Sequence, residues 1–245
     1  MIINLRQHHS PNLLQQVYTG LYSDIFTDPA EIEPMEAFAE RLWSQELPTF
    51  QPLTHFFISG EDLLSPHPQI WGFVVCEAYR RSCCGIITFI AVAPQARGKG
   101  LSRQLMTQAR QALKTDMDQE LVALFAEMHN PRQSSGPDAI DPGIRLRIMA
   151  KLGAHWVPLR YVQPELQPGA PRGRHLLLAA FPTQENSQGV TLATAAVEQF
   201  LLDFYQGLAV PDPQQDRDYR TMVRDLRGET LVPNLAPELP TVRLV

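Results

Sequence analysis

The 245-residue sequence has few cysteines, few charged residues and no long apolar run. Its three cysteines are too few for the disulfide scaffold of a small secreted protein. The longest apolar run, around 86–93, is far too short to span a bilayer, so no membrane partner is expected. No positively charged segment followed by an apolar one opens the chain, and we therefore expect a cytoplasmic protein.

Charge is scarce and slightly acidic. Charged residues make up 19% of the chain, and the formal net charge is −5. This balance gives no basic surface that would hold a polyanion, so no nucleic-acid partner is expected. Hydrophobic residues reach 44%, which is enough for a packed core and excludes disorder as the main state. The length suits one large domain, or one and a half.

Strands and helices alternate along the chain. The patterns predict strands over 2–5, 55–59, 70–79, 85–92, 121–126, 156–162 and 175–181, and helices over 11–21, 35–42, 101–113 and 144–152. Two further helices are expected beyond Pro182, one over 193–208 and one starting at Asp212-Pro213 and ending before Gly228. We expect the apolar stripe over 193–208 to pack on the core, with a dimer face or the wall of an acyl pocket as alternatives. This order of elements indicates an α/β or α+β domain.

A turn with two glycines, between a buried strand and a helix, is the strongest functional signal. From 92 to 102 the chain reads Val-Ala-Pro-Gln-Ala-Arg-Gly-Lys-Gly-Leu-Ser. Gly98 and Gly100 let successive backbone N–H groups converge, and the following helix adds the positive end of its dipole. Such a turn binds a pyrophosphate, with Arg97 and Lys99 adding charge at its rim. The spacing fits neither a Walker loop nor a dinucleotide fingerprint.

This segment resembles the signature of the GNAT superfamily of acyl-CoA-dependent N-acyltransferases. Residues 95–100 are similar to the family's Gln/Arg-x-x-Gly-x-Gly/Ala motif, and Val-x-Pro precedes them. The Lys-Leu-Gly at 151–153 is similar to the end of a later family helix. The resemblance covers about residues 1–181 and implies a mixed, mostly antiparallel central sheet flanked by helices. We therefore expect a GNAT-like domain over 1–182, with a C-terminal helical extension over 183–245 packed on it.

The resemblance also implies a cofactor, acetyl-CoA or another acyl-CoA. Backbone amides from Gln95 or Arg97 to Ser102 would hold its pyrophosphate. The pantetheine arm would pair with the strand at 90–92, where Ile90 N–H would polarise the thioester carbonyl. Asn130 stands where the family often has an asparagine beside this arm. The cofactor-binding residues expected in this way are Ile90, Ala91, Val92, Gln95, Arg97, Gly98, Lys99, Gly100, Leu101, Ser102 and Asn130.

Two departures from the family affect proton transfer. Some members place a base glutamate at the position of Ile86, and many place a tyrosine acid at the position of Met149. Neither of the side chains found here transfers a proton. The fold and cofactor expectations are unaffected, but the catalytic residues have to be sought elsewhere in this chain.

Three other residues are candidates for that role. Glu127 is the first choice for a base, with His129 two residues later on the same strand face, although both also fit a solvated strand end. Glu77 is the second choice, and its ordinary interpretation is an ion pair with one of the arginines at 80–81. Tyr161 is the candidate acid, or otherwise a half-buried strand aromatic. That these residues lie near the acyl site is what the resemblance implies.

These features predict direct transfer of an acyl group, by default acetyl, from CoA to a primary amine of a small molecule. One alternative is a catalytically silent protein that binds or senses acyl-CoA. Another is an acyltransferase whose donor is an acyl carrier protein. No metal is expected, because His8-His9, His55 and His67 have no Cys or carboxylate partners at ligand spacing. The acceptor, the acyl length and a homodimer stay open.

Overall fold

A seven-stranded sheet runs through the computed structural model, which describes residues 1–28, 31–44, 50–117, 119–133, 141–167, 169–182, 191–226 and 229–231. The strands lie in the order β1 (Ile2–Asn4), β2 (Leu53–Glu61), β3 (Gln69–Tyr79), β4 (Cys84–Val92), β5 (Ala123–His129), β7 (Leu176–Pro182) and β6 (His155–Trp156). Neighbours pair antiparallel except β4 and β5, which are parallel. The predicted mixed, mostly antiparallel sheet is confirmed.

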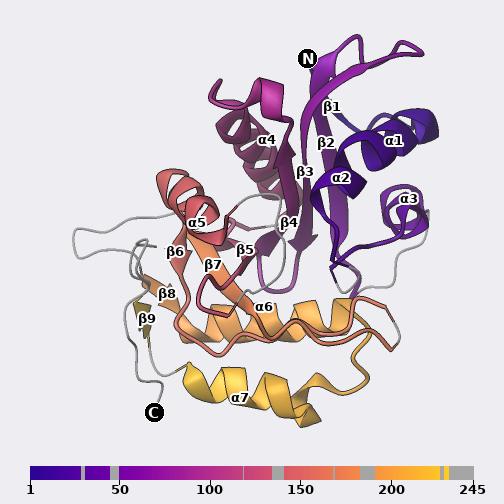
Figure 1. Ribbon diagram of the computed structural model, residues 1–245. Helices are drawn as coiled ribbons and strands as arrows, with labels where there is room; N and C mark the ends of the chain where they lie inside the picture. Colours follow the sequence, from indigo (N-terminus) through magenta and orange to yellow (C-terminus); the bar gives the residue numbers. More distant parts are fainter. Residues whose placement is uncertain are drawn as a thin grey trace.

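Helices cover both faces of this sheet (Figure 1). On one face lie α4 (Leu101–Asp116) and α5 (Pro142–Lys151), whose apolar side chains pack against residues such as Val74, Cys76 and Ala126. The opposite face has two separate covers. One is formed by α1 (Pro11–Val17), the π-helical turn η1 (Tyr18–Tyr22), α2 (Ser23–Ile25) and α3 (Met35–Trp43); the other is formed by α6 (Thr194–Gly207) and α7 (Arg217–Asp225).

The smaller elements connect these layers. They are the 3-10 turns η2 (Pro94–Ala96) and η3 (Pro213–Gln215) and the two-stranded sheet of β8 (Thr191–Ala193) and β9 (Glu229–Leu231). The core side chains of α6 and α7 belong to the same cluster as Phe125 and Leu178 of the sheet. The helical extension is therefore part of the core. The division of the chain at 182/183 stays a prediction, since 183–190 lie outside the described residues.

Helix starts follow the local signals in the sequence. Ser10 Oγ accepts a hydrogen bond from Leu13 N over 3.3 Å, with proline at the first helical position of α1. Helix α7 differs from the expectation, because Asp212-Pro213 opens only the turn η3. Asp216 accepts from the backbone N–H groups of Asp218 and Tyr219, and the α-helix begins after this cap.

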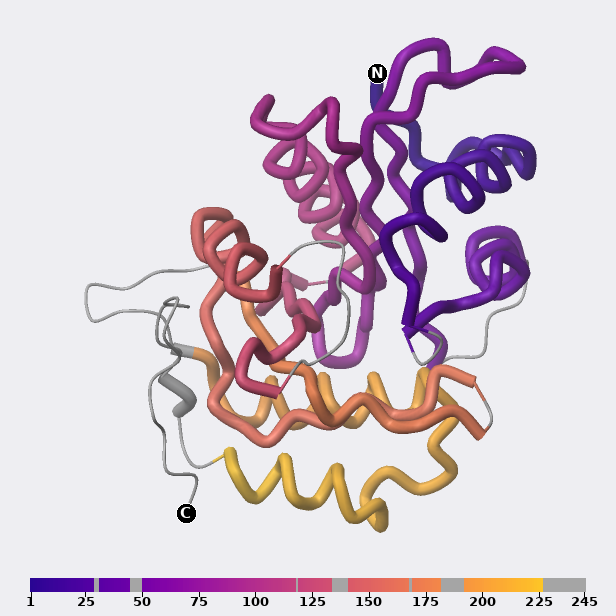
Figure 2. Tube along the Cα trace, in the orientation of Figure 1, coloured from indigo at the N-terminus to yellow at the C-terminus, as the bar shows by residue number. Residues whose placement is uncertain are grey.

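The strand predicted over 156–162 is also wrong in extent, because β6 ends at Trp156. Leu159 N and Tyr161 N each donate to the carbonyl two residues earlier. These tight turns take the chain out of the sheet, and 158–163 cross the face that α6 covers (Figure 2). Burial against α6 gives this segment the apolar pattern of a strand. The loop residues 134–140 and the tail beyond 231 lie outside the described residues.

The described helices are all too short or too polar to cross a bilayer.

Candidate active site

The two parallel strands of the sheet diverge part-way along their length. Pairing of β4 with β5 runs from Cys84–Ala123 to Ile87–Ala126, after which both strands continue. The register between β3 and β4 shifts at Val75/Cys76, so Thr88 is a bulged residue. A bulge bends its strand, and this one lies directly after the last β4–β5 pair. We call the gap between 88–92 of β4 and 127–129 of β5 the splay.

The backbone of β4 presents donors to the splay. Ala93 N donates to Trp71 O on the β3 side, over 2.8 Å. Backbone N–H groups along a strand alternate between its two edges, so Ile90 N–H points to the opposite edge, toward the splay. This direction is the one that the predicted carbonyl-polarising donor requires, and that role itself stays a prediction.

A first pocket, the glycine-loop pocket, opens at the splay. Of the eleven residues expected to bind the cofactor, eight line it: Ile90, Ala91, Val92, Arg97, Gly98, Gly100, Leu101 and Ser102. Gly98 and Gly100 both have φ +76°, a left-handed backbone conformation that residues other than glycine adopt at a cost of about 1–2 kcal/mol. Within the described residues, no heavy atom lies within 4 Å of a Cβ built on either glycine, so they leave this side of the loop open. Ile148 and Met149 of α5 form part of the wall.

The other three residues that were expected to bind the cofactor are not among those that line this pocket. Gln95 and Lys99 are exposed beside the loop. Asn130 follows β5, where its backbone N donates to His175 O over 2.8 Å and its Oδ1 accepts from Arg132 N over 3.0 Å. Asn130 thus closes a turn at the end of the strand, and its predicted contact with the cofactor stays untested.

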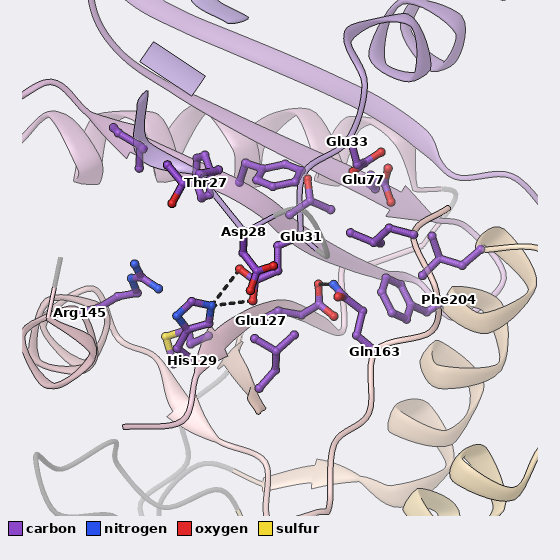
Figure 3. A pocket seen from close by; sticks show the side chains of 18 of the residues that line it. Thr27, Asp28, Glu31, Glu33, Glu77, Glu127, His129, Arg145, Gln163 and Phe204 are labelled. Carbon is purple, nitrogen blue, oxygen red and sulfur yellow. Dashed lines mark hydrogen bonds and ion pairs between the residues drawn. The ribbon is translucent and has the colours of Figure 1, made fainter. Parts of the chain in front are cut away.

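A second pocket, the acidic pocket, lies between the two helical covers (Figure 3). Glu77, Thr88 and Glu127 lie on the sheet beneath it, and Phe204 and Leu208 at the end of α6 close one side. The residues that it shares with the glycine-loop pocket are Ile25, Phe26, Thr88, Glu127, Met128 and Arg145. The two pockets therefore meet at the splay, and α6 supplies a pocket wall.

Glu127 stands where the pockets meet. It is half-buried, and its two carboxylate oxygens have different partners: Tyr161 Oη donates to Oε1 over 2.5 Å, and Gln163 Nε2 donates to Oε2 over 2.8 Å. Burial raises the pKa of Glu127 to about 7, and the negative charges of Glu31 and Glu77 act in the same direction. The two hydrogen bonds lower this pKa but only partly offset burial.

Tyr161 lies behind this carboxylate. It is buried, burial and the Glu127 charge raise its pKa well above the usual value, and it is not among the residues that line either pocket. Its hydroxyl contacts Glu127 directly. The geometry fits a residue that positions the carboxylate, and the predicted role as an acid stays untested.

The Glu77 carboxylate contacts three neighbouring side chains. Tyr79 Oη donates to Oε2 over 3.0 Å, and Arg41 Nε and Thr54 Oγ1 each lie 3.4 Å from Oε1. Arg41 also binds the buried Glu33 over 2.5 Å, so one guanidinium compensates two carboxylates.

The expected ion pair of Glu77 with an arginine at 80–81 is wrong. Arg80 donates to Asp116 O, and Arg81 reaches Gln206 and Asp203 on α6. These arginines lie in the turn after β3, whereas the Glu77 side chain is on the face of the sheet that Arg41 reaches from α3.

His129 is on the same face as Glu127 but has a different partner. Its Nε2 lies 2.7 Å from Oε1 and 2.8 Å from Oε2 of Glu31, and His175 Nε2 lies 2.6 Å from the same Oε1. Burial raises the pKa of Glu31, but its bonds to the two histidines outweigh burial and lower that pKa overall. The sequence analysis did not find Glu31, His175, Arg41 or Gln163, because nothing local marks their partners.

Residues 17–133 match the family model described as the acetyltransferase (GNAT) family. This match, over just under half of the chain, makes that part of the chain similar to a GNAT acetyltransferase domain. This stretch of the chain holds the glycine loop, Glu77 and Glu127. Tyr161, Gln163 and α6 lie outside the match.

Solved structures of acetyltransferases resemble the chain at low identity. The ribosomal-protein-S18-alanine N-acetyltransferase from Escherichia coli shares 14% identity, over 78% of this chain and 97% of that one, with a TM-score of 0.46. An IAA acetyltransferase from Bacillus cereus shares 16%, over 74% and 98%, with a TM-score of 0.41. A comparison with curated proteins gave no match. The assignment of the GNAT domain rests on the family model and the sheet.

Proposed function

We propose that the protein transfers an acyl group, by default acetyl, from acyl-CoA to a primary amine of a small molecule. The observation that supports this most is the splay, which joins the glycine-loop pocket to the acidic pocket with Glu127 lining both. A thioester and an amine entering from opposite sides would meet there. The proposal includes a cytoplasmic location, which fits three free cysteines, Cys76, Cys83 and Cys84.

The glycine loop and β4 would hold the cofactor. Backbone amides at the start of α4 would bind the pyrophosphate, where the helix dipole favours negative charge. The β4 edge beyond Ile87 would pair with the amides of the pantetheine arm. Ile90 N–H would donate to the thioester oxygen as it gains negative charge, a contribution of ~3 kcal/mol for one oriented donor.

Glu127 would act as the base. An amine reaches the site as an ammonium ion and must lose a proton before its nitrogen attacks the thioester carbon. Glu127 would accept that proton, the neutral nitrogen would form the new C–N bond, and the C–S bond would break. The second proton that the nitrogen loses as the amide forms would protonate the CoA thiolate. Positioned base catalysis of this kind contributes roughly 10²–10⁴-fold. The carboxylates that line the acidic pocket favour a cationic acceptor.

Tyr161 would hold Glu127 in place through its hydroxyl. To act instead as the acid toward the leaving thiolate, that hydroxyl would have to leave Glu127. The proposal therefore gives Tyr161 a positioning role and keeps Glu77, which Arg41 and Tyr79 already bind, as the second candidate for the base.

The first test is calorimetry of the full chain with acetyl-CoA, octanoyl-CoA and free CoA. We expect micromolar binding, with the two acyl forms differing in affinity. Absence of binding to all three would contradict a CoA donor and favour a carrier protein. Binding without turnover of any amine in a broad panel would contradict the enzyme and favour a silent acyl-CoA sensor.

The second test is Glu127→Gln with two acceptors. Turnover of the best alkylamine is expected to fall by roughly 10²-fold or more while the acyl-CoA dissociation constant is unchanged. Hydroxylamine is already neutral at neutral pH and needs no base, so its turnover should fall much less. An equal loss with both acceptors would contradict the role of Glu127 as a base.

A further inference from the structure

Three metal-ligating side chains converge beside the acidic pocket. Glu31 follows α2, His129 is the last residue of β5, and His175 directly precedes β7. One ligand atom from each lies within 4.8 Å of the other two. Both histidines direct Nε2 at the same carboxylate, over 2.6–2.8 Å, and their ring centroids are 5.2 Å apart. All three side chains are partly buried.

The sheet places the two histidines on neighbouring strands. β5 and β7 pair through His129–Leu176, and the next hydrogen bond runs from Asn130 N to His175 O. The histidines therefore come from adjacent strands that are joined by a continuous ladder. Glu31 approaches from a separate segment, and Figure 3 shows its carboxylate directed at His129.

We propose that Glu31, His129 and His175 bind one divalent transition-metal ion of the Zn²⁺ class. Two imidazole nitrogens and one carboxylate oxygen are a set that Zn²⁺ prefers. Tetrahedral bonds of about 2.1 Å place ligand atoms about 3.4 Å apart, so the Nε2–Oε1 distances of 2.7 Å and 2.6 Å need to lengthen by less than about 1 Å. The proposal departs from the expectation of no metal, which considered only histidines close to ligands in the sequence.

A fourth coordination position would face the acidic pocket. Glu31 and His129 line that pocket, whereas His175 is not among its lining residues, so an ion held by the three would lie at the pocket wall. Three protein ligands with one open position are typical of a site that exchanges water for another molecule. There the ion would bind an oxygen or nitrogen atom of a molecule in the acidic pocket. Metal binding does not depend on acyl transfer, so either proposal can be contradicted while the other still holds.

The test uses the full chain, dialysed against a chelator and titrated with Zn²⁺ and Co²⁺ in the absence of acyl-CoA. We expect one equivalent of Zn²⁺ by calorimetry, and with Co²⁺ the intense visible absorption of a four-coordinate ion. Glu31→Gln, which keeps a hydrogen-bond partner for the histidines, and His175→Ala should each weaken Zn²⁺ binding by roughly tenfold or more. His67→Ala, an exposed histidine outside the cluster, is the matched control and should bind as the unmodified chain does.

Two results would overturn the proposal. One is no Zn²⁺ binding by the unmodified chain, in which case the three residues form only a hydrogen-bonded tie between a loop and the sheet. The other is equal binding by Glu31→Gln, His175→Ala and His67→Ala, which would place the ion elsewhere. Thermal unfolding of each metal-free variant shows whether it is folded. If His175→Ala does not fold, Zn²⁺ binding by Glu31→Gln tests the proposal.

Discussion

Tyr205 on α6 donates a hydrogen bond from its hydroxyl to the backbone oxygen of Val162, over 2.7 Å. Val162 stands between Tyr161 and Gln163, the two residues that hold Glu127. Its backbone N also donates to Met222 Sδ of α7, over 3.4 Å. The carboxylate at the splay is therefore positioned by helices that lie outside the GNAT match.

Tyr161→Phe is expected to reduce turnover without weakening acyl-CoA binding. The substitution removes the hydroxyl that holds Glu127 Oε1 and leaves the ring in the core. Loss of one hydrogen bond of about 1–1.5 kcal/mol corresponds to roughly a tenfold fall in kcat. Steady-state kinetics and calorimetry measure the two effects. Tyr219→Phe is the control, because Tyr219 is also buried but its hydroxyl does not bind Glu127. An equal fall in kcat in both variants would contradict the positioning role of Tyr161.

Glu77→Gln should mainly lower stability, whereas Glu127→Gln should mainly lower turnover. Glu77→Gln removes one of two charges that compensate Arg41 in a buried site, and we expect the free energy of unfolding to fall by about 1–3 kcal/mol. Glu127→Gln keeps an acceptor for Tyr161 and should be nearly neutral for stability while losing turnover. Urea unfolding and initial rates of both variants check this. A stable Glu77→Gln protein with no turnover would make Glu77 the base.

Gly100→Ala should weaken acyl-CoA binding and lower stability together. The residue has φ +76° at the N-cap of α4, where an alanine costs about 1–2 kcal/mol although no atom obstructs its Cβ. Gly20→Ala is a matched control, since its Cβ is equally unobstructed but no left-handed φ is required there. That change should be neutral or slightly stabilising. Calorimetry with acetyl-CoA and thermal unfolding distinguish the two variants.

The ion pair of Arg160 with Asp225 should contribute stability that depends on pH. Burial raises the pKa of Asp225, but its hydrogen bonds and charge interaction with Arg160 outweigh this and lower that pKa overall. A lowered carboxyl pKa stabilises the folded state above the unfolded value of about 3.9. This stability is lost as the pH falls through the lower pKa of the folded state.

Arg160→Gln measures this effect. At neutral pH we expect it to lower the free energy of unfolding by about 1 kcal/mol at most, because half of the Arg160 side chain is exposed. In urea unfolding, the difference from the unmodified chain should shrink as the pH is lowered below the unfolded carboxyl pKa of about 3.9. Arg103→Gln, on the exposed face of α4, should show no such pH dependence. A difference that is constant with pH would contradict the assignment.

Features encoded by adjacent residues could be predicted from the sequence. The glycine loop is one, because two glycines, a preceding strand and a following helix define its geometry within about ten residues. Glu127 is another, since its place at a strand end follows from the apolar run before it. Both lie at the splay, and their predicted roles there stay predictions.

Contacts made by turns and separate elements could not be predicted in this way. Gln163 reaches Glu127 only because the chain leaves the sheet after Trp156, and the apolar pattern of 157–162 fits a strand equally well. Glu31 is 98 residues from His129 and 144 from His175, and no local pattern records such a contact. In each case tertiary packing decided the partner.

The unpaired edge of β4 at the splay has a consequence for self-association. Free N–H groups on a strand edge usually attract another strand and lead to aggregation. A peptide strand needs about 4.8 Å of separation and room for side chains above and below it. Here β5 already diverges from the same edge, while helices cover both faces of the sheet. We therefore expect this gap to accept a slender chain without side chains more readily than a polypeptide strand, which would protect the free protein from edge-to-edge aggregation.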